Sequence, residues 1–173
     1  MDALEILREQ HLDARSAFEQ IEQASPDQRG ALWAKLRAEL KAHEQMEELF
    51  VYDPVARDAD GRDQVLTAWE EEHHNQVAEA EALMSEIGRL EPREAQWLEK
   101  FKALRQALER HIDQEETQIW PRIRSVWGPE KLEQTGSRMQ VVKTAARAGA
   151  SVSGAVGAAG EALKDAAERV RNR

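Results

Sequence analysis

The sequence contains no cysteine, one tyrosine and three phenylalanines among its 173 residues. The absence of cysteine excludes disulfides, thiolate catalysis, and zinc or iron–sulfur sites that need thiolate ligands. No run of about 18 apolar residues could span a bilayer, and the first residues lack the charge and hydropathy order of a signal peptide. We therefore expect a soluble cytoplasmic protein without a transmembrane segment.

Basic residues are scarce in most of the chain. The net charge is −9, yet residues 131–173 contain 8 Lys and Arg against 4 Asp and Glu, so the preceding part is strongly acidic. Nucleic-acid binding needs clustered basic side chains that displace the counterions of phosphates. The charge distribution therefore argues against a nucleic-acid partner, whereas it is compatible with bound cations.

Strand patterns are also missing, because no run alternates Val, Ile and Thr with polar residues, and the composition is rich in Ala, Glu, Leu, Gln and Arg. Start and stop signals predict four helices joined by short connections, which favours an all-α, up-down-up-down four-helix bundle. The second helix should end near Pro54 and the fourth at Pro121, because proline disfavours helical geometry in the preceding residue. The predicted helices begin near Asp2, Ser25, Gln64 and Glu91.

Three parts follow from this pattern: the four-helix bundle in residues 1–125, a short helix packing on it in residues 126–144, and a tail in residues 145–173. The tail is basic and rich in Ala and Gly, and each glycine within a helix costs about 1 kcal/mol relative to alanine. We expect a weakly helical or flexible tail, and the alternative is a basic amphipathic arm that contacts a membrane surface or a protein weakly. The oligomeric state is left open.

Each of the four predicted helices carries one histidine on its apolar stripe, where residues repeat at spacings of three and four. In the doublet at 73 and 74 only His73 lies on this stripe, because a stripe through His74 would bring three glutamates inside. With antiparallel neighbours and 1.5 Å of rise per residue, the four positions agree in height to roughly one or two turns. We therefore expect one layer of inward-facing histidines, formed by His11, His43, His73 and His111.

Two glutamates follow these histidines by one turn on the same stripes: Glu47 after His43 and Glu115 after His111. An unpaired buried carboxylate costs several kcal/mol, and no Lys or Arg lies on these stripes to compensate the two charges. Metal cations would supply the missing positive charge. Mixed imidazole and carboxylate ligands suit iron, manganese or zinc, and carboxylates can bridge two such ions.

The order of these elements, H, then HxxxE, then H, then HxxxE, resembles the hemerythrin-like (HHE cation-binding) domain family. The resemblance lies in "LREQHLDARSAF", "ELKAHEQMEELF", "WEEEHHNQV" and "ALERHIDQEETQIWPRI", and covers roughly residues 1–125. It implies a four-helix bundle that holds two non-heme iron ions with bridging carboxylates and an open coordination position. By this resemblance the metal ligands are His11, His43, Glu47, His73, His111 and Glu115.

Two differences separate the chain from the oxygen-carrying hemerythrins. Those proteins have a second histidine one turn after the third-helix ligand, where this chain has Val77, and HxxxxD on the fourth helix, where it has HxxxE followed by Glu116. One iron then lacks a nitrogen ligand, and water, Glu44 or His74 could replace that ligand. We expect a dry wall around the open position, formed by Leu7, Leu40, Leu104 and Leu108.

The resemblance implies a di-iron protein that binds or reacts with dioxygen, peroxide or nitric oxide, in sensing, scavenging or storage; whether it is an enzyme is left open. The alternatives are an iron- or cation-binding module without redox turnover and a structural bundle that acts through its basic tail. A ferritin-like site would need Glu-x-x-His on two helices, and here this motif occurs only within residues 70–74. A calcium loop around Gly61 lacks its first carboxylate and its final glutamate.

Overall fold

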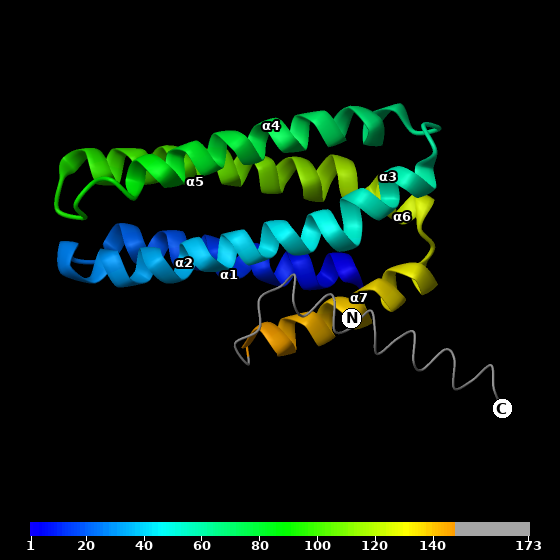
Figure 1. Ribbon diagram of the computed structural model, residues 1–173, viewed down its shortest axis with the longest axis horizontal. Helices are drawn as coiled ribbons and strands as arrows, with labels where there is room; N and C mark the ends of the chain where they lie inside the picture. The colour runs from blue at the N-terminus through cyan, green and yellow to red at the C-terminus, as the bar shows by residue number, and fades with distance from the viewer. Residues whose placement is uncertain (148–173) are drawn as a thin grey trace.

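The computed structural model describes residues 1–147, all of whose regular elements are helices (Figure 1). The elements in chain order are α1 (Ala3–Gln23), α2 (Pro26–Glu47), η1 (Glu48–Tyr52), α3 (Asp53–Ala59), α4 (Gln64–Ile87), α5 (Ala95–Gln114), η2 (Glu115–Ile119), α6 (Trp120–Val126) and α7 (Pro129–Arg147). The predicted tail lies mostly outside the described residues.

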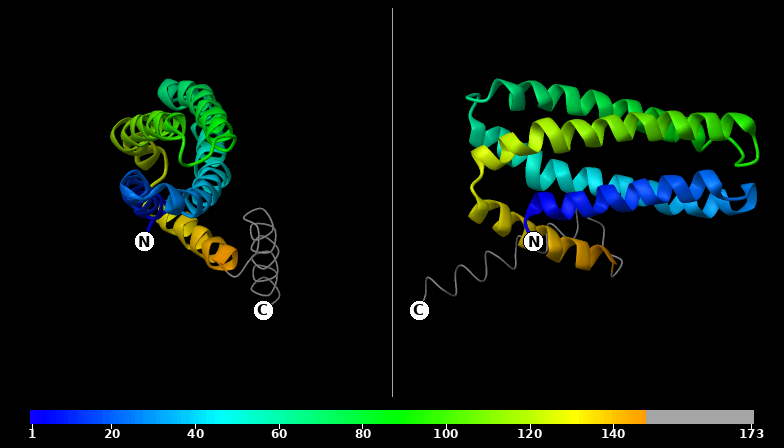
Figure 2. Two further views of the ribbon diagram at one scale, coloured as in Figure 1. Left: turned by 90° about the vertical axis from the view of Figure 1, so that its left-hand side faces the viewer. Right: turned by 180° about the vertical axis from the view of Figure 1, so that it is seen from behind.

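Four long helices form the predicted up-down-up-down bundle. The hairpin of α1 and α2 lies beside the hairpin of α4 and α5, and both short loops are at the same end of the molecule (Figure 2). Local signals start α1, α2 and α4 as expected, whereas α5 starts at Ala95, four residues after Glu91. Asp2 and Glu5 form a reciprocal capping box, Gln28 accepts from the backbone of Ser25, and Asp63 caps α4.

The second and fourth predicted helices do not end at their prolines, as the sequence led us to expect. Each passes through one π-helical turn, η1 or η2, and continues as α3 to Ala59 or as α6 to Val126. In the π-helical turns the backbone N–H groups of Asp53 and Trp120 bond to the carbonyls five residues earlier. Pro54 and Pro121 directly follow these two residues and lie in the first turn of the next α-helix, where the missing N–H of proline is tolerated.

The π-helical turns lie directly beside the predicted ligands. Glu47 is the last residue of α2 before η1, and Glu115 is the first residue of η2. The wider turn places Tyr52 and Trp120, which follow these glutamates by five residues, back toward the bundle axis. The two interrupted helices therefore bring both a carboxylate and an aromatic residue into the same layer.

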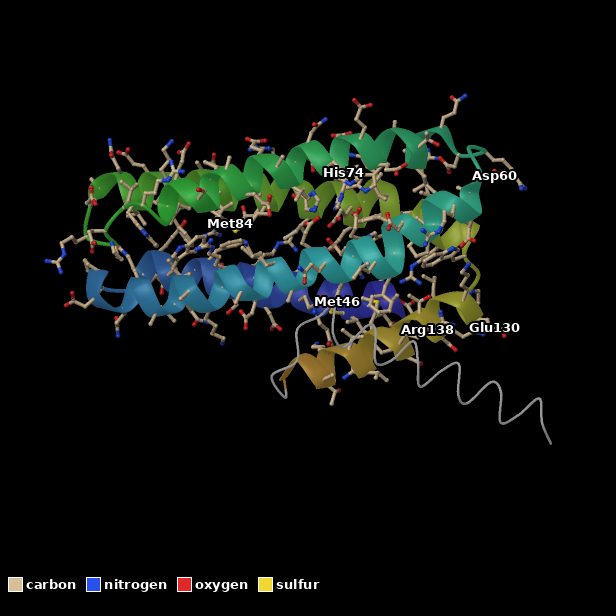
Figure 3. The ribbon with its side chains drawn as sticks, in the orientation of Figure 1. Met46, Asp60, His74, Met84, Glu130 and Arg138 are labelled. Carbon is tan, nitrogen blue, oxygen red and sulfur yellow. The ribbon has the colours of Figure 1, made fainter. Side chains whose placement is uncertain are left out.

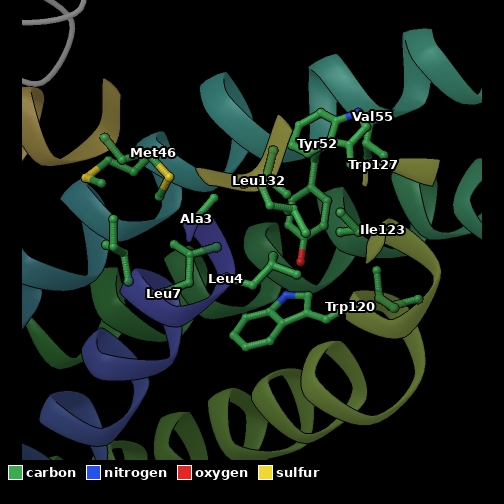
Figure 4. Packing of buried hydrophobic residues seen from close by; sticks show 14 of the residues in the cluster. Ala3, Leu4, Leu7, Met46, Tyr52, Val55, Trp120, Ile123, Trp127 and Leu132 are labelled. Carbon is green, nitrogen blue, oxygen red and sulfur yellow. The ribbon is translucent and has the colours of Figure 1, made fainter. Parts of the chain in front are cut away.

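The apolar core is divided into two clusters by a layer of buried polar side chains. One cluster, around Phe18, Trp97 and Phe101, fills the end near the two hairpin loops. The other fills the opposite end, where Trp120 and Trp127 pack against the start of α1 (Figure 4). The polar layer consists of His11, Glu47, His73, His111 and Glu115, each less than 9% exposed.

Helix α7 covers the outside of α1 and completes the second cluster with Leu132, Met139 and Val142 (Figure 4). The contact is close at Gly136, where an added Cβ would lie 2.5 Å from the carbonyl oxygen of Met1. Among residues 1–147, no helix combines the length and the apolar character needed to cross a membrane.

Candidate metal centre

The four histidines of the apolar stripes meet in one layer, one from each long helix. His11 Nε2 lies 3.1 Å from His43 Nε2, and the rings of His73 and His111 are 5.3 Å apart. His11 and His73 are 1% exposed and His111 is 8% exposed, whereas the side chain of His43 is 14% exposed. The heights estimated from helix lengths were thus accurate enough to place these rings together.

Glu47 and Glu115 lie between the two histidine pairs and are fully buried. Glu115 Oε1 is 3.2 Å from His111 Nε2, and its Oε2 is 3.4 Å from His11 Nε2. Glu47 Oε1 is 3.3 Å from His43 Nε2 and 3.8 Å from His11 Nε2. Each carboxylate therefore borders histidines of more than one helix.

Several polar atoms of this layer have no hydrogen-bond partner within the described part of the chain: both oxygens of Glu47, Oε2 of Glu115 and Nε2 of His73. Within residues 1–147, no Lys or Arg forms an ion pair with either glutamate. Buried unpaired polar atoms cost about 1–3 kcal/mol each, and more when they are charged. A donor set of imidazole nitrogens and carboxylate oxygens with unused lone pairs fits a bound cation.

The potential ligand atoms form two adjacent groups. Atoms of His11, His43 and Glu47 lie within 4.8 Å of one another, and so do atoms of Glu47, His73, His111 and Glu115. Glu47 belongs to both groups, and Glu115 Oε2 also faces His11. The arrangement can thus hold two neighbouring cations with carboxylates between them.

The outward nitrogens of three histidines are fixed by hydrogen-bonding side chains. Oε1 of Glu116 is 2.9 Å from His11 Nδ1, and the side-chain oxygens of Gln10 and Gln76 are 2.8 Å from His43 Nδ1 and 2.7 Å from His111 Nδ1. Such contacts set the tautomer that leaves Nε2 free to bind a metal. Glu116 is therefore placed outside the ligand layer, where it contacts His11 through the other ring nitrogen.

Tyr52 donates a hydrogen bond from its hydroxyl to Glu115 Oε1 over 2.5 Å. Burial and the nearby Glu115 and Glu47 charges raise the pKa of this phenol well above its usual value, so the hydroxyl keeps its proton. The sequence analysis missed Tyr52, Gln10 and Gln76. Their partners lie on other helices, so no spacing within one helix identifies them.

The pKa values in the metal-free layer describe histidinium–carboxylate pairing. Burial opposes the charge of His11, but the nearby carboxylates of Glu115 and Glu47 outweigh it and raise its pKa to about 10. For His111, burial is likewise outweighed, mainly by the Glu115 charge, and the pKa is raised to about 9. Burial favours protonation of Glu47, yet His43 and His11 hold its pKa well below the usual value. Without metal, protons on these histidines therefore supply the positive charge that bound cations would supply.

His73 faces the layer and His74 does not, as predicted from the apolar stripe. His73 is 1% exposed, and burial together with the His111 charge lowers its pKa. His74 is 59% exposed in its side chain, and its ring nitrogens contact the backbone oxygen of Glu70 and the carboxylate of Glu48 (Figure 3).

Glu44 and His74 were both considered as replacements for the missing nitrogen ligand, and Glu44 is the better placed of the two. Its Oε1 lies 3.9 Å from His73 Nε2, and the two residues form a further potential ligand group with Glu48. Burial and the charge of Glu47 raise the pKa of Glu44 to about 8. A cation next to Glu44 would oppose this shift, because it would neutralise the repulsion between the two carboxylates.

Two tryptophans cover the layer from the second core cluster. Trp120 stacks on His11 with ring centres 5.1 Å apart and an interplanar angle of 13°. Trp69 stacks on His111 at 5.8 Å and 23°. These flat contacts fix the ring planes of the histidines and keep water away from this side of the layer.

On the opposite side, a cavity of about 450 Å³ extends from the histidine layer toward the hairpin loops, and its lining also includes Met46 of α2 and Lys143 of α7. Leu40 and Leu108 line it, as expected for the wall of an open position. Leu7 and Leu104, expected in the same wall, are instead fully buried in the two core clusters.

Comparison with known proteins gives two matches. A family model, described as the hemerythrin HHE cation binding domain, matches residues 2–123. The crystal structure of a hemerythrin HHE cation-binding domain-containing protein from Mycobacterium kansasii is similar, with a TM-score of 0.69 and 24% sequence identity over 95% of this chain and 93% of that one. No curated protein matches the chain.

Proposed function

Because the chain belongs to the hemerythrin HHE cation-binding domain family, we propose that it holds a pair of iron ions that bind or react with a small ligand such as dioxygen, peroxide or nitric oxide. The observation that carries the proposal is the pair of adjacent ligand groups that share Glu47. We assign the ligands to His11, His43, Glu47, His73, His111 and Glu115.

In this assignment, His11 and His43 bind one ion and His73 and His111 bind the other, while Glu47 and Glu115 contact both. The contacts of Glu115 support this role, because its two oxygens face histidines of different pairs. Iron, manganese and zinc all accept such ligands, and iron is proposed because carboxylate-bridged histidine sites in this family imply it.

Glu44 completes the proposed ligand set on the His73 side. The chain has Val77 where a nitrogen ligand would be, and Glu44 Oε1 is the nearest carboxylate oxygen of α2 to His73 Nε2. A carboxylate in place of an imidazole adds negative charge, and therefore favours the higher oxidation state of a bound iron. This change favours reaction with peroxide or nitric oxide, in scavenging or sensing, over reversible oxygen storage.

When bound, the iron pair would supply the redox chemistry, and the protein would supply orientation and exclusion of water. Tyr52 holds Glu115 through its hydroxyl, and Gln10, Gln76 and Glu116 hold the histidine rings. The stacked tryptophans close one side of the layer, so a small ligand approaches from the cavity on the other side.

Metal analysis combined with visible absorption spectroscopy tests this proposal. After aerobic reconstitution we expect two iron ions per chain and a charge-transfer band that changes when peroxide or nitric oxide is added. Less than one metal per chain after reconstitution would contradict a metal centre. Stable metal binding without a spectral response or peroxide consumption would favour the second candidate, a cation-binding module without redox turnover.

A double substitution separates both readings from a purely structural bundle. In a structural bundle, His43→Leu together with Glu47→Leu should stabilise the fold without functional loss, because an uncompensated polar layer is removed. In a metal protein the same change should abolish metal binding.

A further inference from the structure

The cavity beside the histidine layer is much larger than a diatomic ligand or peroxide requires. Its volume of about 450 Å³ is roughly fifteen times that of a water molecule, which occupies about 30 Å³. Pockets for small organic molecules have volumes of about 300–1,000 Å³. The volume alone therefore suggests an occupant with a carbon skeleton.

The cavity is polar at the histidine layer and apolar over most of its remaining wall, although charged side chains, among them Glu39, Lys41 and Glu81, also border it. At the polar end lie His11, His43, His111 and Glu44. Beyond them, side chains of three helices form the wall: Leu36, Leu40, Val77, Ala80, Met84 and Leu108. A wall of this kind repels water and favours alkyl groups, at about 0.8 kcal/mol for each buried methylene.

The directions of the helices explain why the apolar wall lies on one side of the histidine layer. Leu36 and Leu40 precede His43 on α2, Ala80 and Met84 follow His73 on the antiparallel α4, and Leu108 precedes His111 on α5. All of these positions therefore lie on the same side of the histidine layer, toward the hairpin loops. Met84 lies at the seam between the two hairpins in Figure 3.

The wall is also accessible from outside. Leu40, Val77 and Leu108 are only partly buried, although they lie on the inward stripes of their helices. The seam between α2 and α4 is thus less tightly closed than those within each hairpin, where α1 packs on α2 and α4 packs on α5. A ligand can enter here without separating the hairpins.

We propose that this cavity binds a small organic molecule with an alkyl chain, whose oxygen-bearing head group faces the histidine layer. The head-group contact rests on the proposed metal centre. The binding of the chain rests only on the apolar wall, so the two parts can be tested separately.

Calorimetric titration of the iron-loaded protein with a series of alkanoates from acetate to octanoate tests the complete proposal. Each methylene that enters the cavity should strengthen binding about threefold to fourfold. Octanoate should then bind at least about a hundredfold more tightly than acetate. Equal affinities of acetate and octanoate would overturn the proposal.

Cavity-filling variants locate the binding site. Ala80→Phe should weaken octanoate binding at least about tenfold and leave acetate binding unchanged, because the added ring occupies the volume meant for the chain. Ala78→Phe is the matched control on the exposed face of α4. Leu40→Trp, at a half-buried position, repeats the test where Ala80→Phe fails to fold. Unchanged octanoate affinity in a folded, cavity-filled variant would overturn the proposal.

Binding experiments on metal-free protein test the cavity proposal independently of the metal centre. In protein stripped of metal, 1-octanol should bind to the wild type and to Ala78→Phe, and at least about tenfold more weakly to Ala80→Phe. The iron content of each reconstituted variant is measured in parallel. Absence of iron with intact octanol binding would contradict the metal centre alone, whereas absence of octanol binding would overturn the cavity proposal.

Discussion

At the scale of single residues, adjacent histidines on α4 differ in what they face. His73 Nε2 is buried beside Glu44 and has no hydrogen-bond partner among residues 1–147, whereas His74 is largely exposed and contacts Glu48. We expect His73→Ala to lose at least one of two metal ions per chain, and His74→Ala to retain both. Metal analysis after reconstitution measures the difference. Equal metal content in the two variants would contradict the ligand assignment.

Tyr52 contributes to stability through one hydrogen bond, which its buried hydroxyl donates to Glu115. Tyr52→Phe keeps the ring packing but removes the donor, so the carboxylate loses a partner. We expect the metal-free protein to lose about 1–3 kcal/mol of unfolding free energy in urea denaturation. A matching loss in the iron-loaded protein is not expected, because metal ions then neutralise Glu115. Equal losses in both states would contradict this account.

At the scale of elements, the docking of α7 onto α1 depends on Gly136. An added Cβ would lie 2.5 Å from Met1 O and 2.8 Å from the carbonyl carbon of Asp2, and neither backbone atom can move without displacing the start of α1. We expect Gly136→Ala to destabilise the protein by about 1–3 kcal/mol despite the better helix propensity of alanine. Thermal unfolding followed by circular dichroism measures the change.

Gly30 provides the matched control, because it also lies within a helix. A Cβ there would meet only Pro92 Cγ at 3.7 Å, which is an ordinary contact. Gly30→Ala should therefore stabilise the protein by up to about 1 kcal/mol. If both alanine variants were stabilised, the close approach of α7 to α1 would be wrong.

The elements also show which features of the structure can be predicted from sequence patterns. Stripe spacing and caps predicted the bundle and the single layer of histidines, because both depend on the period within one helix. The ends of the second and fourth helices were wrong, because the rule for Pro54 and Pro121 assumes α-helical hydrogen bonds in the preceding turn. Gln10, Gln76 and Tyr52 were missed because their partners are chosen by packing between helices.

At the scale of the whole molecule, the buried layer should make the pH dependence of stability differ between the metal-free and the metal-loaded protein. In the metal-free protein the pKa values of His11 and His111 are raised from 6.5 to about 10 and about 9. A raised pKa in the folded state stabilises the protein fully below pH 6.5, and this stabilisation is lost as the pH rises through the folded-state value. The lowered pKa values of Glu47 and Glu115 act at the other end, and their stabilisation is lost as the pH falls below about 4.5.

The unfolding free energy of the metal-free protein should therefore fall by roughly a few kcal/mol between pH 6.5 and pH 10. In the iron-loaded protein the coordinated imidazoles are neutral throughout, so this alkaline loss should disappear, while acid should release the metal and unfold the protein together. Urea denaturation of both forms at several pH values measures the contrast, and His11→Leu should reduce the alkaline loss in the metal-free form. A metal-free protein equally stable at pH 6.5 and pH 10 would show that the histidines do not carry buried protons where the metal ions are proposed to bind.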